Sequence, residues 1–182
     1  MAVFVSAGHN PKGIKVDPGA VGNGFHEANL TVDFRNLVVP ELLKKKVKVI
    51  TDNDDERLGE YLKRIQTGSG SVVLEFHFDA AASPTATGTT ALIGNDADRL
   101  DKAFAKELVE ATSSILGIKN RGVKSEAESH RGSLGLMREQ GIVALLELCF
   151  ISNPDDLKKY QANKKALAIK VAEIVEHYEK MI

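Results

Sequence analysis

The apolar segment 72–79 carries three polar residues at alternating positions, Glu75, His77 and Asp79. If the segment is a β-strand, these side chains share one face, because strand side chains alternate with a period of two. A core cannot hold such groups without partners, since an unpaired buried polar group costs free energy. The pattern therefore favours a polar cleft or a metal site over a satisfied core histidine.

Two further candidates for metal ligands lie near the start of the chain. The apolar stretch 2–7 leads directly into His9, so an imidazole is expected at the carboxyl end of a strand, where α/β sheets build their sites. Glu27 follows a glycine-rich loop at 17–24 whose spacing is not that of a phosphate-binding motif. Taken alone, His9 is better explained as a structural hydrogen-bonding residue, and Glu27 as a carboxylate that complements a helix dipole. Both interpretations as ligands depend on companion residues.

A single carboxylate interrupts the apolar segment 142–150. Burial of Glu147 in this strand is expected to raise its pKa, because desolvation disfavours the ionised form. A carboxyl group that is partly protonated near neutral pH suits general acid and base catalysis. A structural salt bridge would also account for Glu147, but we favour the catalytic interpretation.

Together, these residues form the inventory of a catalytic zinc site: two histidines, a helix-borne glutamate and an isolated strand glutamate. Two neutral imidazoles and one carboxylate leave a zinc ion with a net positive charge. Such an ion can lower the pKa of a water molecule to about 7 and polarise a carbonyl group. The residue types therefore predict hydrolysis.

The elements that must position these residues follow an α/β pattern, in which short apolar runs alternate with segments of helical period. We expect one domain that spans residues 1–182, with helices on both faces of a sheet. Pro40 should bend or interrupt the first helix. The strand at 88–93 could lie at a sheet edge, and 120–140 is the longest segment without assigned structure and a candidate functional loop. The predicted strands are 2–7, 47–51, 72–78, 88–93 and 142–150, and the predicted helices are 27–45, 56–67, 96–116 and 154–181.

Composition and charge exclude several classes of protein. The chain has 182 residues, of which 43% are hydrophobic and 27% charged, as in an ordinary globular protein. Its formal net charge of -1 offers no broad positive field, so nucleic acid is not an expected partner. The single cysteine, Cys149, cannot form an internal disulfide. Polar residues interrupt the first apolar stretch too early for a secretory signal, and no segment is long enough for membrane insertion.

Five motifs, in order along nearly the whole chain, resemble those of the zinc-dependent N-acetylmuramoyl-L-alanine amidases of the third amidase type, especially the catalytic domains of phage endolysins. The motifs are Ser6-Ala7-Gly8-His9, Asp17-Pro18-Gly19-Ala20 with Glu27, the segment 74–80, Asn120-Arg121-Gly122-Val123-Lys124, and the segment 145–154. The resemblance implies a zinc-exopeptidase-like fold, with a twisted mixed sheet of about six strands between helices. It also implies hydrolysis of the amide bond between N-acetylmuramic acid and L-alanine in peptidoglycan.

By this resemblance, His9, Glu27 and His77 would bind one zinc ion, and Glu147 would be the catalytic carboxylate. The chain departs from the family at Asp79, where members commonly carry asparagine. Asp79, His130 and Arg138 are candidate substrate contacts, although the interpretation of His130 as an exposed loop histidine is favoured.

Two other functions compete with the amidase. One is a zinc peptidase that acts on the stem peptides of peptidoglycan, since the same ligand set serves peptide hydrolysis. The other is a peptidoglycan-binding module that has lost catalysis, although the retained Glu147 and ligands argue against it. We expect a phage or prophage lysin that stays in the cytoplasm until it is released to the cell wall, or a domain of a secreted enzyme.

Overall fold

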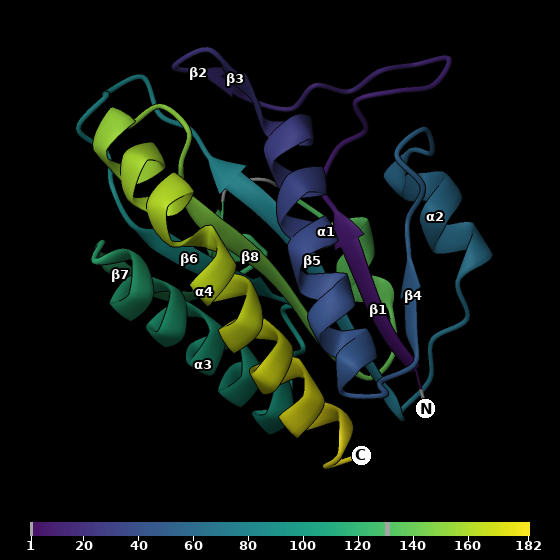
Figure 1. Ribbon diagram of the computed structural model, residues 1–182. Helices are drawn as coiled ribbons and strands as arrows, with labels where there is room; N and C mark the ends of the chain where they lie inside the picture. Colours follow the sequence, from purple (N-terminus) through teal and green to yellow (C-terminus); the bar gives the residue numbers. More distant parts are fainter. Residues whose placement is uncertain (1, 130–131) are drawn as a thin grey trace.

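The computed structural model describes residues 2–129 and 132–182. A six-stranded sheet forms its centre, and a two-stranded hairpin of β2 (Val21–Gly22) and β3 (Phe25–His26) precedes the first helix (Figure 1). Across the sheet the strands are ordered β4 (Val49–Thr51), β1 (Ala2–Ala7), β5 (Ser71–Asp79), β8 (Ile142–Phe150), β6 (Thr89–Ile93) and β7 (Asn120–Ser125).

The sheet is mixed, as expected. Strands β4, β1, β5 and β8 run parallel to one another, whereas β6 is antiparallel to β8 and parallel to β7. The prediction of an edge position for 88–93 is wrong, because β6 pairs on both sides. The edge on this side of the sheet is β7, which lies in the segment that received no predicted structure, and β4 forms the opposite edge. Its six residues alternate little between apolar and polar types, so the strand signal is weak.

The helices are α1 (Glu27–Lys44), α2 (Leu58–Arg64), α3 (Arg99–Leu116) and α4 (Pro154–Glu179), with short 3-10 turns η1 (Ala127–Ser129) and η2 (Gly135–Arg138). Local signals set several of their ends. The Asp98 side chain accepts hydrogen bonds from the amides of Leu100 and Asp101 at the start of α3, and Asn153 caps α4 in the same way. Gly117 ends α3 in the left-handed conformation, with φ 63°.

Two sequence predictions about helices need correction. Pro40 does not interrupt α1, which continues to Lys44 with Pro40 exposed and the stripe Leu30, Phe34 and Val38 buried, and a bend at Pro40 stays a prediction. Helix α2 has 7 residues rather than the predicted span 56–67, and its C-cap, Ile65, is already extended. The described residues contain no helix that is both long and apolar enough to cross a membrane.

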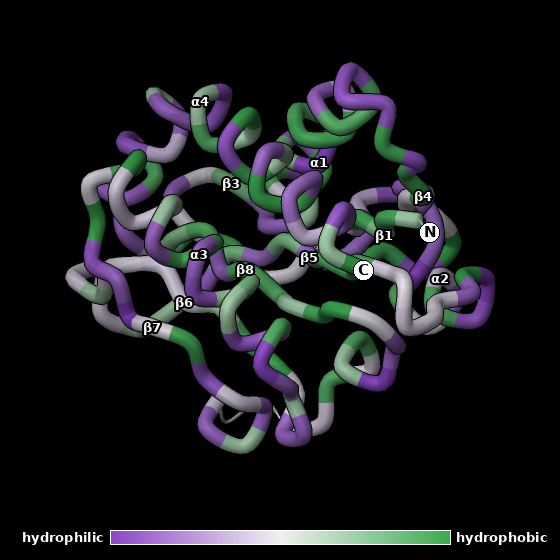
Figure 2. Tube along the Cα trace, turned by 90° about the horizontal axis from the view of Figure 1, so that it is seen from below, coloured by the Kyte–Doolittle hydropathy of each residue, from purple (hydrophilic) through white to green (hydrophobic). Residues whose placement is uncertain are grey.

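The two faces of the sheet are covered unequally. Helices α1, α3 and α4 pack on one face over the larger hydrophobic cluster, as Figure 1 shows. The other face carries a smaller cluster, in which Val73 of β5 and Leu145 of β8 meet Tyr61 of α2 and Leu136 of η2. Figure 2 shows the hydrophobic strands β5 and β8 in the middle of the molecule, between these layers. The less covered face is therefore the one that can open to a substrate.

Candidate metal centre and active site

The polar residues of β5 and β8 lie on the less covered face of the sheet. Because strand side chains alternate, Glu75 and His77 point to the same side as Val73, and Glu147 to the same side as Leu145. His77 and Glu147 are register partners on adjacent parallel strands, which lie about 4.8 Å apart. The two residues are consequently neighbours where the apolar cluster of this face ends.

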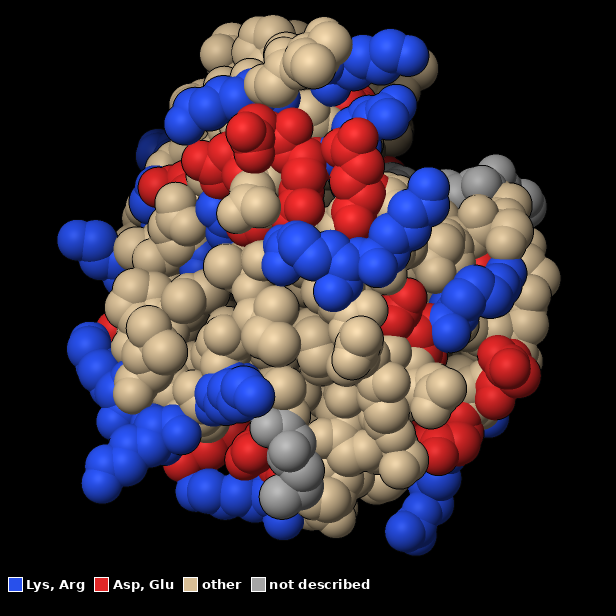
Figure 3. Space-filling model, turned by 90° about the vertical axis from the view of Figure 1, so that its right-hand side faces the viewer, with Lys and Arg blue, Asp and Glu red and all other residues tan. Residues whose placement is uncertain are grey.

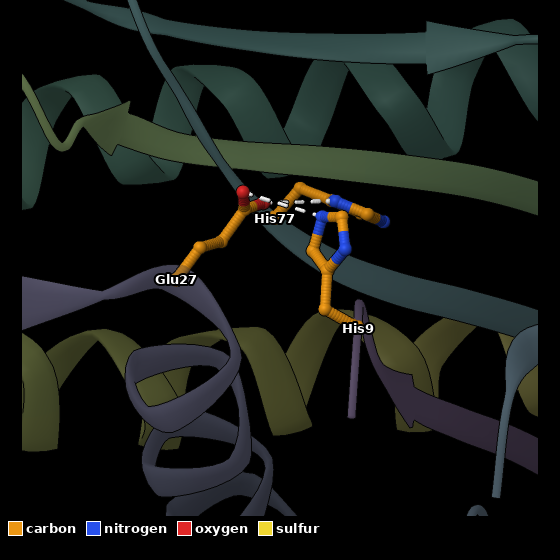
Figure 4. Close-up of side chains that lie close together, drawn as sticks. All are labelled: His9, Glu27 and His77. Atoms are coloured by element: carbon orange, nitrogen blue, oxygen red, sulfur yellow. Dashed lines mark hydrogen bonds and ion pairs between the residues drawn. The ribbon is translucent and has the colours of Figure 1, made fainter. Parts of the chain in front are cut away.

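The ligand atoms of His9, Glu27 and His77 all lie within 4.8 Å of one another. Glu27 Oε2 lies 3.2 Å from His9 Nε2, and Glu27 Oε1 lies 3.0 Å from His77 Nδ1. Figure 4 shows the carboxylate of Glu27 turned toward both imidazole rings, which meet edge to face. The structure thus brings together the three residues that were predicted as ligands, from β1, α1 and β5.

Backbone geometry holds Glu27 and His9 in place. The Glu27 carboxylate accepts hydrogen bonds from the amides of Phe78 and Ala20, at 2.9 and 2.8 Å. His9 has φ 69°, in the left-handed region that non-glycine residues rarely adopt. Gly19 is also left-handed, and a Cβ atom there would lie 2.6 Å from His9 Cδ2. The glycine-rich loop is therefore required for close packing around the two ligands.

The ionisation of the three residues is coupled. Burial opposes ionisation of Glu27, but hydrogen bonds from His77 and His9 outweigh burial and hold the Glu27 pKa well below its usual range. Burial likewise disfavours the His77 imidazolium, but hydrogen bonds to Glu27 and Glu75 raise the His77 pKa to about 10. Burial also disfavours the His9 imidazolium, but its contacts with Glu27 and Asp17 raise the His9 pKa. The cluster is thus built around an ionised carboxylate. A metal cation can bind to this carboxylate in place of the protons on the two imidazoles.

The donor set and its spacing fit a zinc ion. Two imidazole nitrogens and one carboxylate are the protein ligands of several catalytic zinc sites, which keep a fourth position open. Tetrahedral ligands about 2.0–2.2 Å from zinc lie about 3.4 Å from one another. The observed separations are close to that value, each to a different oxygen of the carboxylate: 3.2 Å from Glu27 Oε2 to His9 Nε2 and 3.0 Å from Glu27 Oε1 to His77 Nδ1.

A cleft of about 460 Å³ leads away from the cluster toward α2. His9 and His77 line one wall, and Arg57, Glu60 and Lys63 line the other. The exposed residues of the segment 53–60 include both acidic and basic side chains. Figure 3, which faces this side of the molecule, shows Asp and Glu side chains bordered by Lys and Arg. A polar ligand of peptide size could therefore reach the cluster from this side.

Glu147 is buried, with 2% of its surface exposed, as the sequence predicts. It lines a small pocket of about 50 Å³ together with Asp79, Thr90, Lys124 and Ser129. The structure thus places Asp79 close to Glu147. The raised pKa of Glu147 and the substrate contact of Asp79 stay predictions.

Arg138, another candidate substrate contact, does not join the cluster. Arg138 lies 3.0 Å from the buried carboxylate of Glu126, also binds Ser133, and lines a separate cavity beside Asp96. His130 lies outside the described residues. A role for either in substrate binding stays a prediction.

Two carboxylates contact the histidines in a way that the sequence does not predict. Asp17 Oδ2 lies 2.9 Å from His9 Nδ1, and Glu75 Oε1 lies 2.9 Å from His77 Nε2. The alternation of β5 placed Glu75 on the correct face but could not reveal its partner. The contact of Asp17 depends on a backbone bridge between Asn10 and Asp17, which has no signal in the sequence.

Comparison with known proteins identifies one family that matches nearly the whole chain. A sequence model of the family described as N-acetylmuramoyl-L-alanine amidase matches residues 3–177. A putative N-acetylmuramoyl-L-alanine amidase from Neisseria meningitidis is 26% identical, with a TM-score of 0.73 over 97% of this chain and 94% of that one.

Two more distant structures share the fold. The N-acetylmuramoyl-L-alanine amidase from Clostridium difficile 630 is 20% identical, with a TM-score of 0.79 over 98% of this chain and 96% of that one. The catalytic domain of an endolysin that targets Clostridia difficile is 17% identical, with a TM-score of 0.75 and 97% of each chain covered. The six-stranded mixed sheet with helices on both faces is thus the architecture of these enzymes.

Proposed function

The chain belongs to the N-acetylmuramoyl-L-alanine amidase family, and we propose that it acts with one zinc ion bound by His9, Glu27 and His77. Its substrate in this proposal is the amide bond between N-acetylmuramic acid and L-alanine in peptidoglycan. The observation that supports this most strongly is the convergence of the three ligand atoms beside Glu147, at the end of an open cleft. We also propose that residues 1–182 form one catalytic domain that acts on the cell wall.

The chemistry divides between the metal and the protein. A zinc ion held by His9, Glu27 and His77 would supply Lewis acidity, which would polarise the scissile carbonyl and lower the pKa of a water molecule to about 7. Glu147 accepts the proton of the attacking water and then delivers it to the leaving L-alanine nitrogen. This second step matters because an amine that leaves without a proton is a poor leaving group. His9, Glu27 and His77 would hold the ion, and the amides of Phe78 and Ala20 fix the Glu27 carboxylate by hydrogen bonds.

The decisive experiment is digestion of a defined muropeptide, followed by mass spectrometry of the products. We expect an intact stem peptide with a new L-alanine amino terminus and a sugar with a free lactyl carboxyl group. Cleavage within the stem peptide would indicate a zinc peptidase instead. Binding to sacculi without any released peptide, at full zinc content, would indicate a binding module. Glu147→Gln protein with the same zinc content is the matched control and should release neither product at the wild-type rate.

A further inference from the structure

The two histidines turn opposite ring nitrogens toward Glu27. His9 presents Nε2, and its Nδ1 lies 2.9 Å from Asp17 Oδ2. His77 presents Nδ1, and its Nε2 lies 2.9 Å from Glu75 Oε1. Each imidazole is therefore held between Glu27 and a carboxylate of its own.

Glu75 is held in place for this contact. Only 1% of its surface is exposed, and the strand around it is otherwise apolar apart from Ser71, His77 and Asp79. Its second oxygen, Oε2, accepts a hydrogen bond of 2.9 Å from the hydroxyl of Ser6 on the neighbouring strand β1. A buried carboxylate costs free energy unless it is paired, so its position beside His77 requires a compensating interaction.

The carboxylate beside His9 has a different environment. The Asp17 side chain is 58% exposed, but its loop is fixed by reciprocal backbone hydrogen bonds with Asn10, at 3.0 and 3.1 Å. Its other oxygen, Oδ1, accepts from the amide of Gly19. Because solvent screens an exposed contact, we expect the buried Glu75 to have the larger effect.

We propose that Glu75 is a positioning residue that selects the tautomer of His77, and that Asp17 does the same for His9 with the opposite ring nitrogen. A neutral imidazole carries one N–H, and the hydrogen bond of that N–H decides which nitrogen is free to bind a metal. Glu75 accepts from Nε2–H and so presents Nδ1 of His77 to the ion. This inference rests on the proposed zinc site.

Glu75 is better suited to this role than to direct ligation. Among the described residues, the group whose ligand atoms all lie within 4.8 Å of one another is His9, Glu27 and His77, without Glu75. Glu75 contacts the ring nitrogen of His77 that is not in contact with Glu27. Its second oxygen is engaged by Ser6.

The test combines two measurements on Glu75→Leu and Glu75→Gln proteins. The zinc dissociation constant is obtained by competition with a chromophoric chelator. The ring nitrogens are followed by NMR of protein labelled with ¹⁵N at histidine, which reports whether Nδ1 or Nε2 of His77 binds the metal. Asp156→Asn is the matched control, because Asp156 is also 1% exposed and hydrogen-bonded but contacts Thr87, Gly88 and Phe150 instead of the histidines.

In the wild type we expect zinc on Nδ1 of His77 and Nε2 of His9. Glu75→Leu should bind zinc about 10- to 100-fold more weakly, which is the usual cost of losing the carboxylate partner of a metal-binding histidine. Zinc should then no longer bind His77 through Nδ1 alone. Glu75→Gln keeps an acceptor oxygen, so it should preserve the Nδ1 mode with a smaller loss of affinity. The control should keep the wild-type dissociation constant and ring shifts.

The inference is wrong if Glu75→Leu keeps both the wild-type zinc affinity and Nδ1 coordination, or if wild-type His77 binds through Nε2. Should Glu75→Leu not fold, Ser6→Ala replaces it, because it removes the hydroxyl that donates to Glu75 Oε2 and keeps the Glu75 side chain. Ser6→Ala is expected to weaken zinc binding in the same direction, and an unchanged affinity would overturn the proposal. Failure of the zinc site itself has a different signature, since the wild type would then bind no zinc.

Discussion

Gly8 offers a direct test of the geometry of the metal centre. It joins β1 to His9, and a Cβ atom added there would lie 2.3 Å from Cε1 and 2.4 Å from Nε2 of His77. Gly8 does not have a positive φ angle, so alanine at this position introduces no backbone strain. The substitution Gly8→Ala therefore acts on the site mainly by pushing the His77 ring.

The size of the displacement follows from the contact distances. Ordinary van der Waals contact begins at 3.4 Å, so a contact of 2.3 Å requires a retreat of about 1.1 Å. Misplacement of a catalytic group by about 1 Å can cost about 100-fold in rate. Overpacking should also reduce the free energy of unfolding by about 1–3 kcal/mol. We thus expect a folded protein with weaker zinc binding and turnover reduced by about two orders of magnitude.

The assay compares Gly8→Ala with Gly68→Ala, which adds the same methyl group where nothing lies within 4 Å. Zinc dissociation constants, peptide release from sacculi and urea unfolding are measured on both proteins. The control should behave as the wild type in all three. Wild-type zinc affinity together with wild-type turnover in Gly8→Ala would refute the position assigned to His77.

Three further predictions concern catalysis, the fold and the metal. Glu147→Gln should lower turnover by about 10²- to 10⁴-fold while zinc content stays at one equivalent, because the variant cannot take up a proton; zinc loss would instead make Glu147 a ligand. Arg35→Met should lower the free energy of unfolding in urea by about 3–5 kcal/mol, since it leaves Asp52 buried without its ion pair at 2.8 Å. Dialysis against a chelator should abolish peptide release but keep the helical circular dichroism signal, because the core does not depend on the metal.

Much of the fold follows from local sequence signals. The strand bounds 2–7 and 142–150 are confirmed, since each is a mostly apolar run with a glycine at one end, Gly8 after the first and Gly141 before the second. The start of α4 is confirmed as well, because Asn153 and Pro154 form a strong helix start. The three residues that converge could also be selected from the sequence. Few residues have side chains that bind zinc, and His9 lies just after a segment predicted as a strand while His77 lies within one, which narrows the set of candidate ligands.

The remaining features depend on contacts between distant segments. Strand β7 pairs only with β6 and has a single large apolar residue, Val123. The strand is therefore hard to predict from its sequence. The ion pair of Arg138 with Glu126 likewise depends on how a loop closes. The choice of ring nitrogen in each histidine depends on side chains that approach from different elements, such as Ser6 and Glu75. Periodicity and residue type contain none of this information.

The central claim is that His9, Glu27 and His77 bind one catalytic zinc ion. Anomalous diffraction at the zinc edge, from crystals of the zinc-loaded protein, tests it most directly. We predict a single peak about 2.0–2.2 Å from His9 Nε2, His77 Nδ1 and a carboxylate oxygen of Glu27. A peak ligated by other residues, or no peak at this cluster in protein that releases stem peptides, would contradict the account.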